Sequence, residues 1–204
     1  MSAERPRCGT CSRPQRNCLC QWVRPTEVDT EVVILQHPAE VAHAKNTGLL
    51  LHLSLPNSRL LVGEVWSAQA WTDAGLTSPP TWLLYPRAAS DPAPLGDFTV
   101  NGPAQNTPRN CLVVLDATWR KSRKMLHLSP WLQGLPRLAL TDAPASRYTI
   151  RKAHRAGQLS TLEATCAALS ALEGESAGDR LAPLLSAFDG FVAQQQAWVP
   201  ALMQ

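Results

Sequence analysis

Short aliphatic runs alternate with stretches of helical periodicity along most of the chain. Runs of aliphatic and β-branched side chains predict buried strands at 32–35, 60–62, 82–85, 112–115 and 137–140. Apolar residues at helical spacing predict helices at about 46–53, 120–128, 161–173 and 180–197. Short apolar strands that alternate with helices indicate an α/β fold, with a mostly parallel sheet flanked by helices on both faces.

The length of 204 residues is typical of one domain with a small appendage. We expect a cysteine-rich segment over 1–26 and one α/β domain over 27–204. Residues 86–110 contain five prolines and no hydrophobic period, which predicts a long surface loop or a lid over an active site. In a parallel sheet of this kind, ligands bind beyond the carboxyl ends of the strands.

The composition is that of an ordinary soluble globular protein, with 45% hydrophobic and 17% charged residues. The longest apolar runs are far shorter than the roughly 18 residues that a membrane-spanning helix needs. The first residues also lack the apolar core of a signal peptide. We therefore expect a cytoplasmic protein with no membrane partner.

The net charge of +3 conceals an uneven distribution of charges. Residues 1–24 carry five arginines and one glutamate, and residues 120–155 carry nine lysines and arginines and one aspartate. The rest of the chain is therefore net acidic. Two basic blocks suggest a polyanionic partner, because phosphates that they neutralise release counterions. Solvated helix faces are an alternative explanation of the same pattern.

Four of the six cysteines lie within the first 20 residues, in the order Cys8-x2-Cys11-x6-Cys18-x-Cys20. Disulfides are disfavoured in a reducing compartment, and two close thiolate pairs can converge on one tetrahedral Zn²⁺. With four thiolate ligands the metal would be structural, because no coordination position is left open. A redox pair and free thiols are the alternatives.

A polar segment that follows the clearest predicted strand contains the first candidate catalytic residues. Asp116 lies at the carboxyl end of that strand, where it could act as a general base. Alternatively, Asp116 or Thr118 simply caps the next helix. Trp119 offers a stacking surface for a nucleobase, or else packs in the core.

Two basic groups and one helix start provide candidate binding residues. The basic groups comprise Arg120, Lys121, Arg123, Lys124, Arg147, Arg151, Lys152 and Arg155. The like charges at 120–124 destabilise an isolated helix, and a bound anion would offset that cost. In the second group, arginines near Tyr148 suit an RNA backbone and an unstacked base. Ser160 and Glu163 match a capping box, and the helix start that they mark can also bind a carboxylate or phosphate.

Asn46 opens the first predicted helix, and His37 precedes a proline at the end of the first predicted strand. Each could be a ligand-binding residue or a local capping or turn residue. The sequence contains no GxGxxG, P-loop, HExxH or GxSxG motif. The usual nucleotide enzymes are therefore disfavoured, whereas an unusual fold for an adenosyl cofactor is not.

Five motifs occur together and in order along most of the chain. They are Cys8-x2-Cys11-x-Arg13-Pro14-x3-Cys18-x-Cys20, His37-Pro38-x-Glu40, Asn46-Thr47-Gly48, Asp116-x-Thr118-Trp119 and Leu159-Ser160-Thr161-x-Glu163-Ala164. This series resembles the DTW-domain family, the tRNA-uridine aminocarboxypropyltransferases. Asp-x-Thr-Trp alone is a weak signal, and the specificity comes from the order of all five.

The resemblance implies transfer of a 3-amino-3-carboxypropyl group from S-adenosylmethionine to N3 of a tRNA uridine, with release of 5′-methylthioadenosine. It also implies a SPOUT-like fold with a C-terminal knot. On this expectation Asp116 is the general base, Thr118 orients that carboxylate or the uracil, and Trp119 forms a stacking wall.

The resemblance and the basic groups together predict two binding sites around these catalytic residues. The expected residues for S-adenosylmethionine are Leu115, Tyr148, Arg151, Leu159, Ser160, Thr161 and Glu163. The expected residues for tRNA are His37, Asn46, Arg120, Arg123, Lys124, Arg147 and Lys152. The carboxylate of the donor is expected to meet Arg151 or the helix start at Ser160.

Two other interpretations fit the same sequence. A SPOUT-type RNA methyltransferase would use the same cofactor and would differ in its product. A zinc-containing RNA-binding module without catalysis would need Asp116 only as a helix cap. The protein is expected to act as a monomer or a homodimer.

Overall fold

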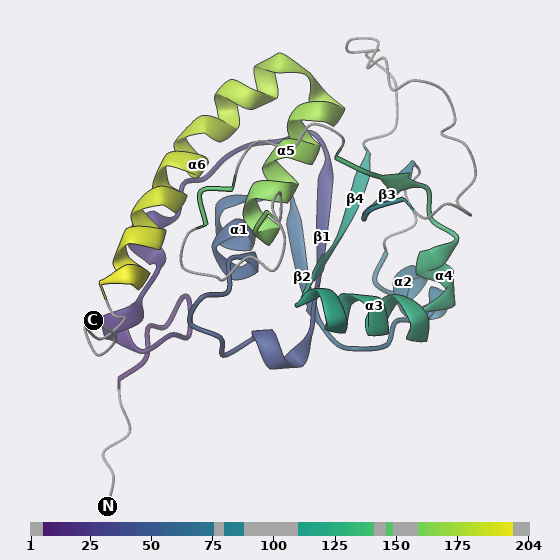
Figure 1. Ribbon diagram of the computed structural model, residues 1–204, viewed down its shortest axis with the longest axis horizontal. Helices are drawn as coiled ribbons and strands as arrows, with labels where there is room; N and C mark the ends of the chain where they lie inside the picture. The colour runs from purple at the N-terminus through teal and green to yellow at the C-terminus, as the bar shows by residue number, and fades with distance from the viewer. Residues whose placement is uncertain (1–5, 76–79, 88–109, 141–145, 149–158, 198–204) are drawn as a thin grey trace, which may run out of the picture.

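A parallel sheet forms the centre of the protein in a computed structural model that describes residues 6–75, 80–87, 110–140, 146–148 and 159–197. Its five strands within these residues are β1 (Glu31–Gln36), β2 (Ser58–Val62), β3 (Thr81–Leu84), β4 (Cys111–Asp116) and β5 (Arg137–Leu138). The strand order is β2-β1-β4-β3-β5, and every neighbouring pair is parallel (Figure 1). The predicted parallel α/β sheet is therefore confirmed.

Hydrophobic cores cover both faces of this sheet. Along β1, Val32 and Ile34 belong to one core and Val33 and Leu35 to the other, and all four are fully buried. The first core includes side chains of α1 (Gly48–Ser54), α5 (Thr161–Glu173) and α6 (Glu175–Gln196). The second includes side chains of α2 (Ala68–Asp73), α3 (Trp119–Leu128) and α4 (Pro130–Gln133). Figure 1 shows these two sets of helices on opposite sides of the sheet, as a strand buried on both faces requires.

The helices differ from the sequence predictions mainly at glycine and proline. Gly174 alone separates α5 from α6, with φ of 80°, a conformation that glycine adopts at little cost. For this reason α6 begins at Glu175 rather than at 180, and it continues through Pro183. Helix α3 ends at Leu128, as predicted, and Pro130 then begins the unpredicted α4 at its first helical position, where proline is favoured.

Two further differences concern short elements. Helix α2 was not predicted, and its six residues begin after Ser67, whose side chain accepts a hydrogen bond from the Ala70 amide. Strand β5 is limited to Arg137–Leu138, shorter than the predicted 137–140. Most of the predicted loop 86–110 and parts of the segments expected to form the knot lie outside the described residues. None of the described helices is both long and apolar enough to cross a membrane.

The cysteine-rich segment packs on the same core as the sheet. It contains η1 (Gln15–Asn17) and η2 (Cys20–Trp22), and its Leu19 is fully buried in the core that α5 and α6 share. The Trp22 indole donates to Gln194 Oε1 at 2.5 Å, and a Cβ built on Gly190 would lie 2.1 Å from the Trp22 ring. The segment therefore lies directly against the C-terminal half of α6, as the purple and yellow ribbons of Figure 1 show.

Candidate functional site

Asp116, at the carboxyl end of β4, is the centre of a buried hydrogen-bond network. Its side chain is 4% exposed. Oδ2 accepts from Gln36 Nε2 at 2.8 Å and from Asn46 Nδ2 at 2.5 Å, and Oδ1 accepts from the Thr161 hydroxyl at 2.7 Å. A carboxylate has about four acceptor positions. Among the described residues, three of these positions are occupied, two on Oδ2 and one on Oδ1.

The N-terminus of α1 approaches this carboxylate more closely than a side chain would allow. A Cβ built on Gly48 would lie 2.5 Å from Asp116 Oδ2 and 2.7 Å from its Cγ. Asn46 is fixed from both ends, since its Oδ1 accepts from the Leu49 amide at 3.1 Å while its amide donates to Asp116. The Asn-Thr-Gly motif thus supplies one donor and the space that the carboxylate occupies.

Sequence reasoning missed Gln36, which bridges Asp116 and Asn46. Its Nε2 lies 2.8 Å from Asp116 Oδ2 and 3.3 Å from Asn46 Oδ1, and the residue is 3% exposed. The available signal was its position as a polar residue that ends a predicted strand. In a parallel sheet, the ends of adjacent strands meet at one edge, and Gln36 is the register partner of Asp116.

The start of α5 connects a second motif to the network. Ser160 and Glu163 form the predicted capping box, with the Ser160 hydroxyl accepting from the Glu163 amide and Glu163 accepting from the Ser160 amide. The Glu163 carboxylate also accepts from the Arg147 amide at 2.6 Å and from the Ser146 hydroxyl. Glu163 therefore ties residues 146–148 to α5, and it has few positions left for another ligand.

Thr118 and Trp119 lie where α3 begins. Thr118 caps this helix by accepting from the Lys121 amide at 3.4 Å. Trp119 is 45% exposed, and its ring meets that of Tyr85 edge to face at 5.8 Å between centroids. Of the two readings of Trp119, a surface platform fits this exposure better than core packing. Leu115, one residue before Asp116, is partly buried.

The predicted basic surface is partly neutralised by acidic neighbours. Lys124 lies 2.9 Å and His37 3.2 Å from Glu64 Oε1, and these neighbours lower the pKa of Glu64 from its ordinary value. Within the described part of the chain, Arg120 and Arg123 form no ion pair and are exposed. Elsewhere, Arg147 contacts Asp189 at 3.0 Å, and the remaining candidates Arg151 and Lys152 lie outside the described residues.

The four N-terminal cysteines form a cluster with the dimensions of a metal site. Their sulfurs all lie within 4.8 Å of one another, with Cys8 and Cys20 at 3.6 Å and Cys11 and Cys18 at 3.8 Å. Tetrahedral Zn²⁺ with sulfur at about 2.3 Å requires separations of about 3.8 Å. The backbone amides of Cys11 and Thr10 lower the pKa of Cys8 to about 6, whereas burial raises that of Cys20 to about 12. A bound cation would favour the thiolate of both.

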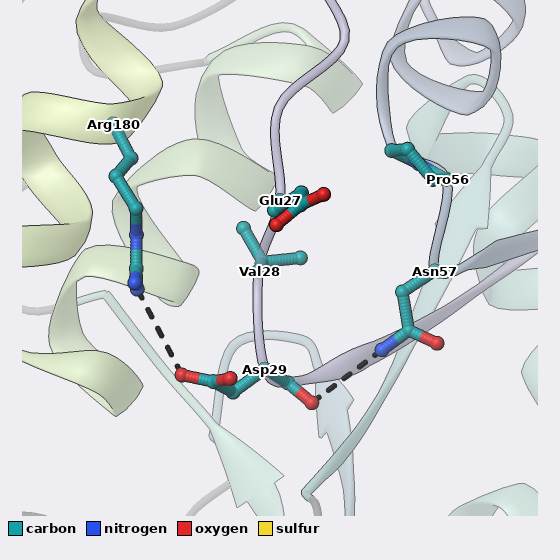
Figure 2. A pocket seen from close by; sticks show the side chains of 6 residues that line it. All are labelled: Glu27, Val28, Asp29, Pro56, Asn57 and Arg180. Carbon is teal, nitrogen blue, oxygen red and sulfur yellow. Dashed lines mark hydrogen bonds and ion pairs between the residues drawn. The ribbon is translucent and has the colours of Figure 1, made fainter.

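A cavity of about 430 Å³ opens at the other end of the sheet. Figure 2 shows it between α6 and the segments that precede β1 and β2, with Arg180 facing Asp29 at 3.9 Å and Asn57 donating to the Asp29 carbonyl. These residues precede the strands, whereas Asp116 follows one. Because ligands of such sheets bind at the carboxyl ends, the candidate active site is at Asp116 and not in this cavity.

The fold and the motifs around Asp116 define a known class of protein. The DTW domain model matches residues 5–196, and the chain belongs to the DTW-domain family. It is 33% identical over 180 residues to mouse tRNA-uridine aminocarboxypropyltransferase 2, a match that covers 83% of this chain and 57% of the relative. The protein of that name from Drosophila melanogaster is 35% identical over 176 residues, and the match covers 83% of this chain and 67% of the relative.

A plant relative extends the similarity. The tRNA-uridine aminocarboxypropyltransferase A of Arabidopsis thaliana is 34% identical over 194 residues, with 81% of this chain and 72% of the relative covered. The chain spans little more than half the length of the mouse relative. Comparison with solved structures returned no significant match.

Proposed function

We propose that this protein transfers the 3-amino-3-carboxypropyl group of S-adenosylmethionine to N3 of a tRNA uridine. The observation that carries the proposal is the convergence of two family motifs on the buried carboxylate of a third. Asn46 and Gly48 come from one motif and Thr161 from another, and all three lie against Asp116. Relatives at 33–35% identity that bear the name tRNA-uridine aminocarboxypropyltransferase support the same activity.

In the proposed reaction, Asp116 accepts the proton of uridine N3 at the acceptor position left on Oδ1. The sulfonium of S-adenosylmethionine would make the γ-methylene carbon of the aminocarboxypropyl chain electrophilic. A bond forms from N3 to this carbon as the carbon–sulfur bond breaks, and 5′-methylthioadenosine leaves with the electron pair. Thr161 and the donors on Oδ2 hold the carboxylate in place, so its contribution combines proton transfer and positioning.

The start of α5 is the proposed site for the carboxylate of the donor. Three backbone amides at this helix start already donate hydrogen bonds. The Ser160 amide donates to the Glu163 carboxylate, the Leu162 amide to the Thr47 hydroxyl and the Glu163 amide to the Ser160 hydroxyl. Among the described residues, the Thr161 amide has none, and it points from a helix N-terminus where an anion is favoured. Leu115, Tyr148 and Leu159 would line the rest of the donor site, and the Arg151 guanidinium is the second candidate group to bind the donor's carboxylate.

Exposed cations at the same edge of the sheet are the proposed tRNA contacts. Arg120 and Arg123 extend from α3 into solvent, and Trp119 presents its ring beside them. We place the target uridine between this ring and Asp116, with Thr118 orienting it. His37, Lys124, Arg147 and Lys152 complete the proposed surface.

The structural parts of the proposal are a zinc ion and a SPOUT-like fold. The four cysteine sulfurs have the donor set and spacing of a closed zinc site, which stabilises the N-terminal segment and takes no part in the reaction. We propose a cytoplasmic location for the same reason, because a site made of four thiolates is favoured in a reducing compartment. Residues 146–148 contact the start of α5, and the start of α5 contacts the end of β4. We include a knotted C-terminal arrangement around the donor in the proposal because the family resemblance implies it.

The test is mass spectrometry of nucleosides from unmodified tRNA incubated with the protein and S-adenosylmethionine. A uridine that gains the aminocarboxypropyl mass, together with released 5′-methylthioadenosine, is the expected result. Asp116→Asn should bind tRNA and lose about 10²–10⁴-fold in rate, since asparagine keeps the shape of the side chain. A gain of one methyl group would identify a methyltransferase. If no new nucleoside formed, the proposed transfer would be refuted and a non-catalytic RNA-binding module would be the remaining interpretation.

A further inference from the structure

Three consecutive backbone carbonyls beside the active site are held by side chains from distant parts of the chain. Arg13 Nη1 donates to the Ala44 carbonyl at 2.8 Å, and its Nη2 donates to the Asn46 carbonyl at 2.9 Å. The Tyr148 hydroxyl donates to the carbonyl between them, that of Lys45. The segment 44–46 has no regular secondary structure of its own. A local turn holds its amides, with the Lys45 and Asn46 amides donating to His43, and the two distant side chains hold its carbonyls.

Arg13 is buried in a way that is costly without a structural reason. It is 8% exposed, its guanidinium lies 5.6 Å over the ring of Phe191, and burial lowers its pKa. Within the described residues no carboxylate forms an ion pair with it. Two carbonyls two residues apart satisfy its planar fork of donors, a geometry that a lysine cannot reproduce.

The same arginine belongs to the cysteine cluster by its place in the chain. It follows Cys11 by two residues and precedes Cys18, and the Cys8 amide donates to its carbonyl at 2.8 Å. The conformation of the cluster thus determines where the guanidinium lies. From the guanidinium, the chain of contacts continues through the Asn46 carbonyl and side chain to Asp116 Oδ2.

We propose that Arg13 is a positioning residue through which the four-cysteine segment sets the orientation of Asn46 and hence of Asp116. This inference rests on the proposed function for its kinetic consequence. It gives the metal segment a role in turnover without any contact between the metal and the substrates. A purely structural Arg13 would change stability and leave the turnover of folded protein intact.

The experiment compares Arg13→Ala, Asn46→Ala and the double variant in the full-length, zinc-loaded protein. Arg16→Ala is the matched control, because it removes the same charge from an exposed position of the same segment. The measurements are zinc content, kcat and KM for both substrates, and hydrogen exchange of the amides at 46–49. These amides report on the loop directly, since the Leu49 amide is bonded to Asn46 Oδ1.

For Arg13→Ala we expect normal zinc content, a KM close to that of the unchanged protein and faster exchange at 46–49. Its kcat should fall by about 10–10²-fold, the scale of a misplaced catalytic group. The double variant should be no slower than the slower single variant, because both changes break one chain of contacts. Arg16→Ala should match the unchanged protein in zinc content, in kcat and in hydrogen exchange at 46–49.

Multiplying losses in the double variant, or unchanged exchange at 46–49 in Arg13→Ala, would overturn the inference. So would a normal kcat accompanied only by lower stability. If the unchanged protein forms no aminocarboxypropyl nucleoside, the proposed function fails separately. Hydrogen exchange then still decides whether Arg13 orders the segment, with faster exchange supporting that ordering and unchanged exchange refuting it.

Discussion

Replacing Gly48 by alanine tests how tightly the structure confines the Asp116 carboxylate. The added methyl group would lie 2.5 Å from Oδ2 and 2.7 Å from Cγ, inside the closest approach of real atoms. The carboxylate cannot retreat freely, because Gln36 and Asn46 hold Oδ2 and Thr161 holds Oδ1. Either the carboxylate shifts and these hydrogen bonds lengthen, or the first turn of α1 moves.

The expected loss of stability is small because two effects oppose each other. Overpacking at a buried position costs about 2 kcal/mol, whereas alanine favours a helix by about 1 kcal/mol relative to glycine. The net loss of about 1 kcal/mol corresponds to a decrease in Tm of roughly 2–4 °C at this chain length. On the proposed function, turnover is affected more, because a shift of the proposed general base by about 1 Å can cost about 10²-fold in kcat.

The assay measures nucleoside formation under single-turnover conditions together with thermal unfolding of the same samples. Gly178→Ala is the matched control, since this helical glycine has no neighbour nearer than 3.9 Å to a built Cβ. The control should be as active as the unchanged protein and slightly more stable. If Gly48→Ala kept full turnover with an unchanged Tm, the close approach to Asp116 would have no functional meaning, and the argument would be refuted.

Three further predictions concern the metal, the RNA surface and one histidine. Cys18→Ser should lose the metal and lower Tm by roughly 5–10 °C, because binding energy at such a site is folding energy; metal analysis and calorimetry check this. Arg120→Ala with Arg123→Ala should reduce the slope of log K against log salt for tRNA by about 1.5, whereas Arg180→Ala at the far edge should not. Burial lowers the pKa of His52, so the unfolded chain binds its proton more readily. Stability should therefore decrease as pH falls below about 6.5, and less so in His52→Asn, as measured by urea unfolding.

Each of these three predictions has a clear contrary result. Equal melting curves with and without a strong chelator would remove the metal from the fold. An unchanged salt slope in the double arginine variant would place the tRNA elsewhere. Identical pH dependence in the histidine variant would assign the acid sensitivity to groups other than His52. Glu64 would not be among them near pH 6, because Lys124 and His37 lower its pKa and its ion pairs fail only at lower pH.

Much of the fold follows from sequence patterns because both faces of the sheet are buried. Short aliphatic runs such as 112–115 favour a strand buried on both faces, and the strands at 31–36 and 111–116 contain the predicted residues. Short elements with weak patterns were harder to predict. Helix α2 has no buried residue and β5 has two residues, so neither carries a hydrophobic period.

The sequence predicts those parts of the candidate site that a local motif defines. It does not predict the parts that depend on contacts between residues far apart in the chain. The capping box of Ser160 and Glu163 and the four-cysteine cluster are present as expected. The partners of Asp116 depend on strand register and on a helix far along the chain, which no local pattern contains. The assignment of Arg13 to the segment 44–46 is of the same kind, because only the folded chain brings them together.

The long sequence separations within the Asp116 network have a consequence for biosynthesis. Its donors Gln36, Asn46 and Thr161 lie 80, 70 and 45 residues away from it. A nascent chain still attached to the ribosome at residue 150 has the carboxylate and two donors, but not the third donor or the helix that covers them. Such a chain buries an incompletely paired charge, which is costly. Prematurely terminated products should therefore be substrates for proteases rather than weakly active enzymes.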